Sequence, residues 1–90
     1  MGVNVRIPPM MRKCTNGQEL VEVAGSTPSE VLGKLTAEFP KIRRWLYDKQ
    51  GTLRPQLQFY LNKERLRADD LGRALHDGDE LLILVAIAGG

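Results

Sequence analysis

The sequence is poor in the residues that build redox and metal sites. Among its 90 residues it has one cysteine, Cys14, and one histidine, His76. One cysteine cannot make an internal disulfide, a multi-cysteine metal site or a four-cysteine iron–sulfur cluster. We therefore expect no bound metal or cofactor, and a passive thiol at Cys14. The scarcity of cysteine also fits a reducing cytosol, so we expect a cytoplasmic protein.

Net charge, aromatic residues and long apolar runs are scarce as well. The formal net charge is +2, and aromatic residues make up 6% of the chain. A nucleic-acid-binding surface combines many basic and stacking side chains, so none is expected here. No stretch approaches the roughly 18 consecutive apolar residues that a membrane-spanning helix needs. We therefore expect neither nucleic acid nor a membrane as a partner.

The N-terminal half shows regular patterns of apolar residues. Apolar and polar side chains alternate over residues 3–7 and 19–23, which predicts two strands of an antiparallel hairpin. Asn16 and Gly17 are a turn signal, and residues 10–16 are expected to form a long loop. The chain is long enough for one small domain with a modest core, so we expect a single domain over residues 1–90.

A helix is predicted to begin after Thr27. Thr27, Pro28 and Glu30 form a capping box in which Thr27 accepts from the Glu30 amide and Glu30 reaches back to the Thr27 amide. Pro40 ends the helix. Gly33 costs up to about 1 kcal/mol relative to alanine inside a helix, and close packing on a sheet is one interpretation of its presence. The apolar stripe of this helix consists of Val31, Leu32, Leu35 and Phe39.

The second half alternates between short elements. We expect a short helical turn over 42–46, a strand over 57–61, a return strand that begins at Leu66, a helical turn over 69–75 and a last strand over 80–85. Lys41, Arg43 and Arg44 form a basic cluster, which is a solvated face by default and an acidic-partner surface as the alternative.

This order of elements predicts an α+β fold of the β-grasp type. The first and last strands run parallel and lie in the middle of the sheet, because the crossover helix joins the two halves. The nearly continuous apolar run over 81–85 fits a strand that is buried in the sheet. The fold is thus a mixed sheet packed on one main helix, with residues 86–90 as a protruding flexible tail.

The C-terminal block carries a specific resemblance. An acidic–Gly–acidic turn at 77–79 precedes the hydrophobic strand, and the chain ends in small residues up to Gly89 and Gly90. This pattern resembles the MoaD/ThiS-type ubiquitin-like sulfur carriers, and the first strand, the Thr27 helix start and the strand over 59–62 also fit. Many relatives have proline just after the last strand, where this chain has Val85 and Ala86.

The resemblance implies a function for the end of the chain. A partner enzyme, an ATP-dependent adenylyltransferase and sulfurtransferase that uses Mg, adenylates the Gly90 carboxylate. A sulfur donor then converts the acyl-adenylate to a thiocarboxylate. Gly89, Ala88 and Ile87 are the residues that thread into the partner, because small side chains let backbone approach backbone. The protein is thus expected to be a co-substrate rather than an enzyme.

The acceptor of the sulfur is harder to assign. The segment from Leu53 through Asn62 resembles both the cysteine-type carriers and related molybdopterin-like carriers. We favour the cysteine-biosynthesis branch, in which the acceptor enzyme is a pyridoxal-phosphate (PLP)-dependent cysteine synthase. The alternative is the small subunit of molybdopterin synthase, whose partner is the large subunit. A second alternative is a ubiquitin-like protein modifier, because conjugation to lysine begins with the same activated glycine.

A docking surface is expected on the sheet face opposite the helix. If Leu81 and Ile83 face the helix, the alternation of a strand points Leu82 and Leu84 the other way. Leu66 is expected to join Leu84 there. An exposed apolar patch beside a reactive tail suits protein docking, so Leu84, Leu82 and Leu66 are the predicted partner-binding residues.

Overall fold

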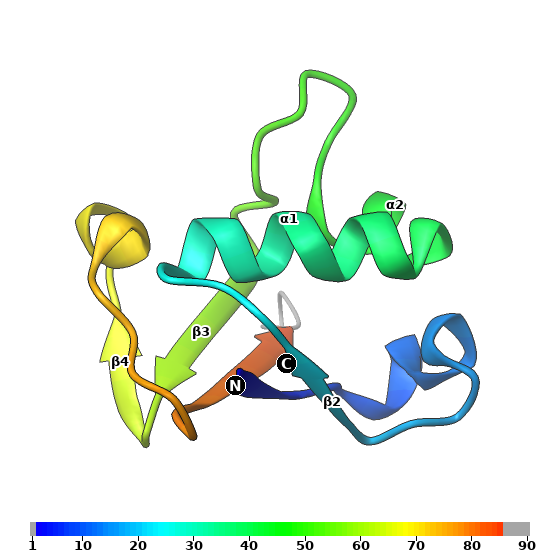
Figure 1. Cartoon of the computed structure of the whole chain (residues 1–90). Coiled ribbons are helices and arrows are strands. Elements are labelled where there is room, and N and C mark those ends of the chain that lie inside the picture. The colour runs from blue at the N-terminus through cyan, green and yellow to red at the C-terminus, as the bar shows by residue number, and fades with distance from the viewer. Residues whose placement is uncertain (1, 86–90) are drawn as a thin grey trace.

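One long helix crosses one face of a five-stranded sheet in the computed structural model of this chain (Figure 1). The structure describes residues 2–85. Three 3₁₀ helices, η1 to η3, and the short helix α2 connect the main elements. The bounds are β1 Val3–Arg6, η1 Pro9–Thr15, β2 Leu20–Val23, α1 Pro28–Glu38, η2 Pro40–Ile42, α2 Arg43–Leu46, β3 Leu57–Leu61, β4 Glu64–Leu66, η3 Ala68–Gly72 and β5 Glu80–Val85.

The strand order β2-β1-β5-β3-β4 confirms the predicted β-grasp topology. β1 pairs with β2 in antiparallel and with β5 in parallel orientation, and β5 pairs with β3 in antiparallel orientation. β5 is therefore the central strand, as its apolar sequence predicted. None of the helices within residues 2–85 is long and apolar enough to cross a membrane.

The core lies between α1 and the inner face of the sheet. Val5, Leu81 and Ile83 of the central strands are completely buried, as are Leu32 and Leu35 of α1. These side chains recur at the period of two of a strand and at the three-to-four spacing of a helix, so one layer packs on the other. Burial of the apolar faces fixes the register of β5, which is the strand that leads to the C-terminal residues.

The start of α1 differs in one contact from the expected capping box. The Thr27 hydroxyl accepts from the Glu30 amide at 3.2 Å, as predicted. The Glu30 carboxylate, however, accepts from the amide of Ser26 at 2.8 Å rather than from that of Thr27. Because Ser26 precedes the cap, the carboxylate also holds the chain that enters the helix.

Three local expectations were wrong. The return strand that was expected to begin at Leu66 instead ends there, since β4 spans Glu64–Leu66. Much of the expected loop over 10–16 belongs to the 3₁₀ helix η1, because Met11 and Thr15 are completely buried and the segment packs on the core. Gly33 does not pack closely on the sheet. It is exposed, and an added Cβ atom would meet nothing within 4 Å.

Candidate functional site

The predicted reacting end lies just beyond the described residues. Gly90 and the three threading residues, Ile87, Ala88 and Gly89, are outside residues 2–85, so their predicted roles stay predictions. What the structure places is the point from which they depart. Val85 ends the central strand and pairs with Leu57 at the start of β3. Five residues span at most about 18 Å when fully extended, so Gly90 lies within about that distance of this end of the sheet.

The outer face of the sheet, opposite α1, carries two of the three predicted docking residues. The register sets Leu82 beside Arg6 and Tyr60, and Leu84 beside Gln58. Leu84 is 38% exposed, and Leu82 is half-buried. The two leucines therefore lie where the alternation of β5 predicted them.

The expected position of Leu66 was wrong. Leu66 pairs with Phe59 across the β3–β4 ladder and is only 6% exposed. Directly paired residues point to the same face of a sheet, and Phe59 belongs to the core. Leu66 therefore packs on the helix side and offers nothing to a partner on the outer face.

Ion pairs join the outer face across strands that are far apart in sequence. The Arg6 guanidinium lies 3.0 Å from a Glu19 oxygen and 3.2 Å from a Glu80 oxygen. The hydrogen bond and the charge of Glu80 raise the pKa of Arg6, with a smaller contribution from Glu19. Because these groups are exposed, the pairs contribute little to stability. The paired side chains form a row of charges beside Leu82, so the outer face combines apolar and charged groups.

The acidic–Gly–acidic turn fixes the start of β5. The Asp77 carboxylate accepts from the Gly2 amide at 2.7 Å, and Asp79 accepts from the His76 amide at 2.8 Å. The bond from His76 and a further one from Asn62 lower the pKa of Asp79. Gly78 has a φ of 88°, the left-handed region in which glycine is favoured. The turn therefore ties β5 to the N-terminus of β1 and to the end of β3.

The described residues show no assembled metal centre. Within residues 2–85, no group of three or more His, Cys, Asp or Glu side chains is placed to hold a metal ion. The Cys14 thiol lies 3.6 Å from the Lys41 carbonyl oxygen, to which it donates. His76 contributes its backbone amide to the turn before β5.

Comparison with known families identifies the fold and the type of protein. The model of the ThiS family matches residues 5–90. The chain belongs to the ThiS family. It is also 38% identical to the sulfur carrier protein CysO of Mycobacterium tuberculosis, over an alignment of 93 residues that covers both chains completely, and the Mycobacterium bovis protein of that name matches equally. The chain is thus a full-length homologue of a sulfur carrier protein.

Solved structures agree with this assignment. The crystal structure of M. tuberculosis CysO superposes with a TM-score of 0.83 at 35% identity and covers 94% of this chain and 99% of that one. A chain in the crystal structure of the Amycolatopsis orientalis BexX/CysO complex gives a TM-score of 0.84 at 34% identity, with 98% of this chain and 99% of that one covered. SAMP1 of Haloferax volcanii gives a TM-score of 0.85 over 100% of both chains, but at 22% identity this likeness concerns the fold alone. The resemblance seen in the sequence is thereby confirmed.

Proposed function

We propose that this protein carries sulfur as a thiocarboxylate on the Gly90 carboxyl. The observation that carries the proposal is the full-length similarity, at 38% identity, to a protein named as a sulfur carrier. The structure adds a physical reason, since the central strand ends at Val85, where it pairs with Leu57 of β3, and the first half of the strand also pairs with β1. A rigid strand presents the last five residues to a partner without the entropy cost of ordering a longer segment.

The proposed chemistry needs an activating enzyme, because oxide is a poor leaving group. The Gly90 carboxylate attacks the α-phosphorus of ATP, which the partner binds with Mg, and pyrophosphate leaves. Hydrosulfide then attacks the carbonyl carbon of the acyl-adenylate, AMP leaves, and a proton is released as the thiocarboxylate forms. The chain supplies the reacting carboxyl and the docking surface, while the partner supplies the catalytic groups.

We further propose cysteine biosynthesis in the cytoplasm as the destination of the sulfur. Both curated relatives described above are named CysO, which favours this branch over the molybdopterin synthase alternative. In this pathway the thiocarboxylate sulfur displaces the activating group from the β-carbon of a serine derivative held by a PLP-dependent enzyme. The product is a thioester. The amine of the new cysteine attacks the Gly90 carbonyl, the C–S bond breaks and an amide forms, and a peptidase hydrolyses this amide with water to release cysteine and restore the carboxylate.

The outer face is the proposed contact with these enzymes. Leu84 and Leu82 lie on the strand that ends five residues before Gly90, so an enzyme that holds Gly90 covers them. We expect Leu84→Glu to slow adenylation, because docking would bury a carboxylate without a partner. Ala37→Glu is the matched control, since Ala37 is exposed on α1, which covers the other face of the sheet. Adenylation of the Leu84 variant at the normal rate would refute this contact.

The reacting group is tested by removing it. Purified wild-type protein and a variant lacking Gly90 are incubated with an extract of the native host, ATP, Mg and sulfide, and their masses are measured. We expect the wild-type chain to gain sulfur at its last residue and the deletion variant to gain neither AMP nor sulfur. A deletion variant that still accepts either group would rule out Gly90 as the site.

A further inference from the structure

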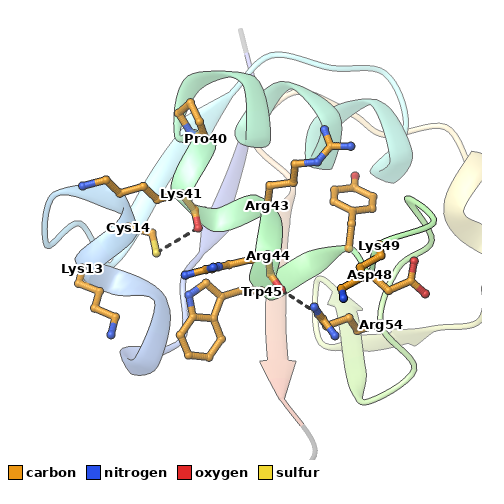
Figure 2. A pocket seen from close by; sticks show the side chains of 11 residues that line it. Lys13, Cys14, Pro40, Lys41, Arg43, Arg44, Trp45, Asp48, Lys49 and Arg54 are labelled. Atoms are coloured by element: carbon orange, nitrogen blue, oxygen red, sulfur yellow. Dashed lines mark hydrogen bonds between the residues drawn. The ribbon is translucent and has the colours of Figure 1, made fainter.

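Six basic residues line one open cavity, for which the proposed chemistry gives no role (Figure 2). The cavity has a volume of about 900 Å³, and the half-buried Trp45 and Cys14 also line it. The whole chain has 13 Lys and Arg residues against 11 Asp and Glu, yet this cavity gathers six of the former and one of the latter. We call the six the basic surface: Lys13, Lys41, Arg43, Arg44, Lys49 and Arg54.

The charges of the basic surface are not neutralised by the described part of the chain. None of the six forms an ion pair with a carboxylate among residues 2–85, whereas Arg6, Arg12, Lys34 and Arg73 all do so elsewhere. The one carboxylate in the cavity, Asp48, accepts from the backbone amides of Gln50 and Thr52 at 2.9 and 3.0 Å. Asp48 therefore shapes its own loop, and a positive potential remains at the surface.

Several contacts hold together the segments that carry these charges. The Arg54 side chain donates to the Arg44 carbonyl at 2.7 Å, and its amide donates to the Leu46 carbonyl at 2.8 Å. Leu46 is completely buried and anchors α2 on the core. The Lys13 ammonium lies 5.8 Å from the centre of the Trp45 ring, within the range of a cation–π contact. The six side chains thus come from η1, η2, α2 and the loop after α2, and contacts of Lys13 and Arg54 join these segments.

The basic surface lies at the end of the sheet where β5 ends. β1 and β5 are parallel, so η1, which follows β1 and carries Lys13, lies at the same end as Val85. β3 is antiparallel to β5 and begins with Leu57 opposite Val85, three residues after Arg54. In Figure 1 the arrow of β5 points to the side where α2 lies and away from the β3–β4 turn.

We propose that the basic surface binds an acidic surface of the enzyme that activates Gly90. The inference rests on the proposed sulfur-carrier function and names the kind of partner. Five residues reach at most about 18 Å from Val85 to Gly90, and a typical interface covers about 800 Å² of each protein. An enzyme that holds the Gly90 carboxyl therefore stands against this end of the molecule and meets the basic surface.

The form of the surface favours a protein over a small anion. Five of the six basic residues are exposed and Arg54 is half-buried, so the charges lie at the rim of an open cavity. Rim charges of this kind steer association and set its rate. Trp45, between the charges, is an aromatic residue of the type that anchors protein interfaces. The complementary surface on the partner enzyme is an acidic patch that surrounds an apolar contact to Trp45.

The test measures sulfur loading of three purified ¹⁵N-labelled proteins. Wild type, Lys41→Glu/Arg44→Glu and the control Lys34→Glu/Lys63→Glu are each added to an extract of the native host with ATP, Mg and sulfide. The initial rate of thiocarboxylate formation on labelled Gly90 is followed by mass spectrometry at low and high ionic strength. Both double variants change the charge equally, but Lys34 and Lys63 are exposed residues outside the basic surface.

We expect the Lys41/Arg44 variant to load at least about tenfold more slowly at low ionic strength, and the control to stay within about twofold of wild type. High ionic strength should slow sulfur loading of the wild-type protein and reduce the difference in loading rate between wild type and the Lys41/Arg44 variant. A fourth labelled protein, Arg44→Lys, keeps the charge and should load at the wild-type rate. Thermal unfolding of each variant confirms that these exposed substitutions leave the fold intact.

The outcomes separate the two proposals. No thiocarboxylate on the wild-type chain would overturn the sulfur-carrier function and this inference with it. Loading of the Lys41/Arg44 variant at the wild-type rate would overturn the inference alone. If the control variant loads as slowly as the Lys41/Arg44 variant, the partner is attracted by net charge rather than by this surface. If the difference in loading rate between wild type and the Lys41/Arg44 variant disappears after nuclease treatment, nucleic acid is the occupant. Each of these two results would refute the proposal.

Discussion

The same substitution, glycine to alanine, should have opposite effects at two positions of this protein. Gly33 lies inside α1, is exposed, and would place a Cβ atom in open space. Gly25 lies before α1, and an added Cβ atom would lie 2.6 Å from Cγ2 of Val31, a completely buried residue. Valine is stiff at χ1, so its methyl group cannot move aside cheaply.

The magnitudes follow from these surroundings. Gly33→Ala removes the helix penalty of glycine and should stabilise the protein by about 0.5–1 kcal/mol. Gly25→Ala overpacks the core and should destabilise it by about 1–3 kcal/mol. With a urea m-value of about 1 kcal/mol per M, the first change raises the unfolding midpoint by about 0.5–1 M and the second lowers it by about 1–3 M.

The assay is urea unfolding followed by circular dichroism and by the fluorescence of Trp45, with equal m-values as the sign that only stability has changed. A lower midpoint for Gly33→Ala would mean that the exposed face of α1 makes a contact that a methyl group disrupts. An unchanged midpoint for Gly25→Ala would mean that the chain before the helix is not held against Val31. Either result would refute the packing described for α1.

Three further predictions concern stability. Leu66→Ala should lower the free energy of unfolding by about 2–3 kcal/mol and the melting temperature by about 10–20 °C, because Leu66 is in the core. Leu84→Ala should lower the free energy of unfolding by less than about 1 kcal/mol, because Leu84 is on the outer face. Equal losses of stability would contradict the faces assigned to the two leucines. Thr27→Ala should cost about 1 kcal/mol in urea unfolding through the lost cap, while Thr27→Ser should restore most of it. Folding lowers the pKa of Asp79, so the ionised carboxylate stabilises the folded protein. This contribution is complete at pH values above the pKa of the unfolded state, about 3.9, and is lost as the pH falls through the pKa of the folded state. The stability difference between wild type and Asp79→Asn should therefore shrink below about pH 4, and a constant difference would refute this role.

The sequence predicts the order, type and pairing of the main elements because each has a strong local signal. Thr27 and Pro28 mark the helix start, and alternation marks β1, β2 and β3. The apolar run of β5 also indicates a central strand, which the structure confirms. These signals are local or depend on the period of one element, so no knowledge of distant neighbours is needed.

The errors arise where neighbours in space decide the outcome. The face on which Leu66 lies depends on the register of β4 against β3, and three residues are too few to show an alternation. The open surroundings of Gly33 depend on which face of α1 meets the sheet. Part of the basic surface is visible as a local cluster at 41–44, but Lys13 and Arg54 join it only through the parallel pairing of β1 and β5 and the return of the chain after α2.

The most direct measurement is mass spectrometry of the C-terminal tryptic peptide of the endogenous protein, isolated from its native host. Cleavage after Arg73 gives residues 74–90, which contain neither methionine nor cysteine, so oxidation at sulfur cannot imitate the exchange. We expect a fraction of this peptide in which sulfur replaces one carboxyl oxygen of Gly90. A peptide found only as the free carboxylate, or joined to lysines of other proteins as a branched peptide, would contradict this expectation.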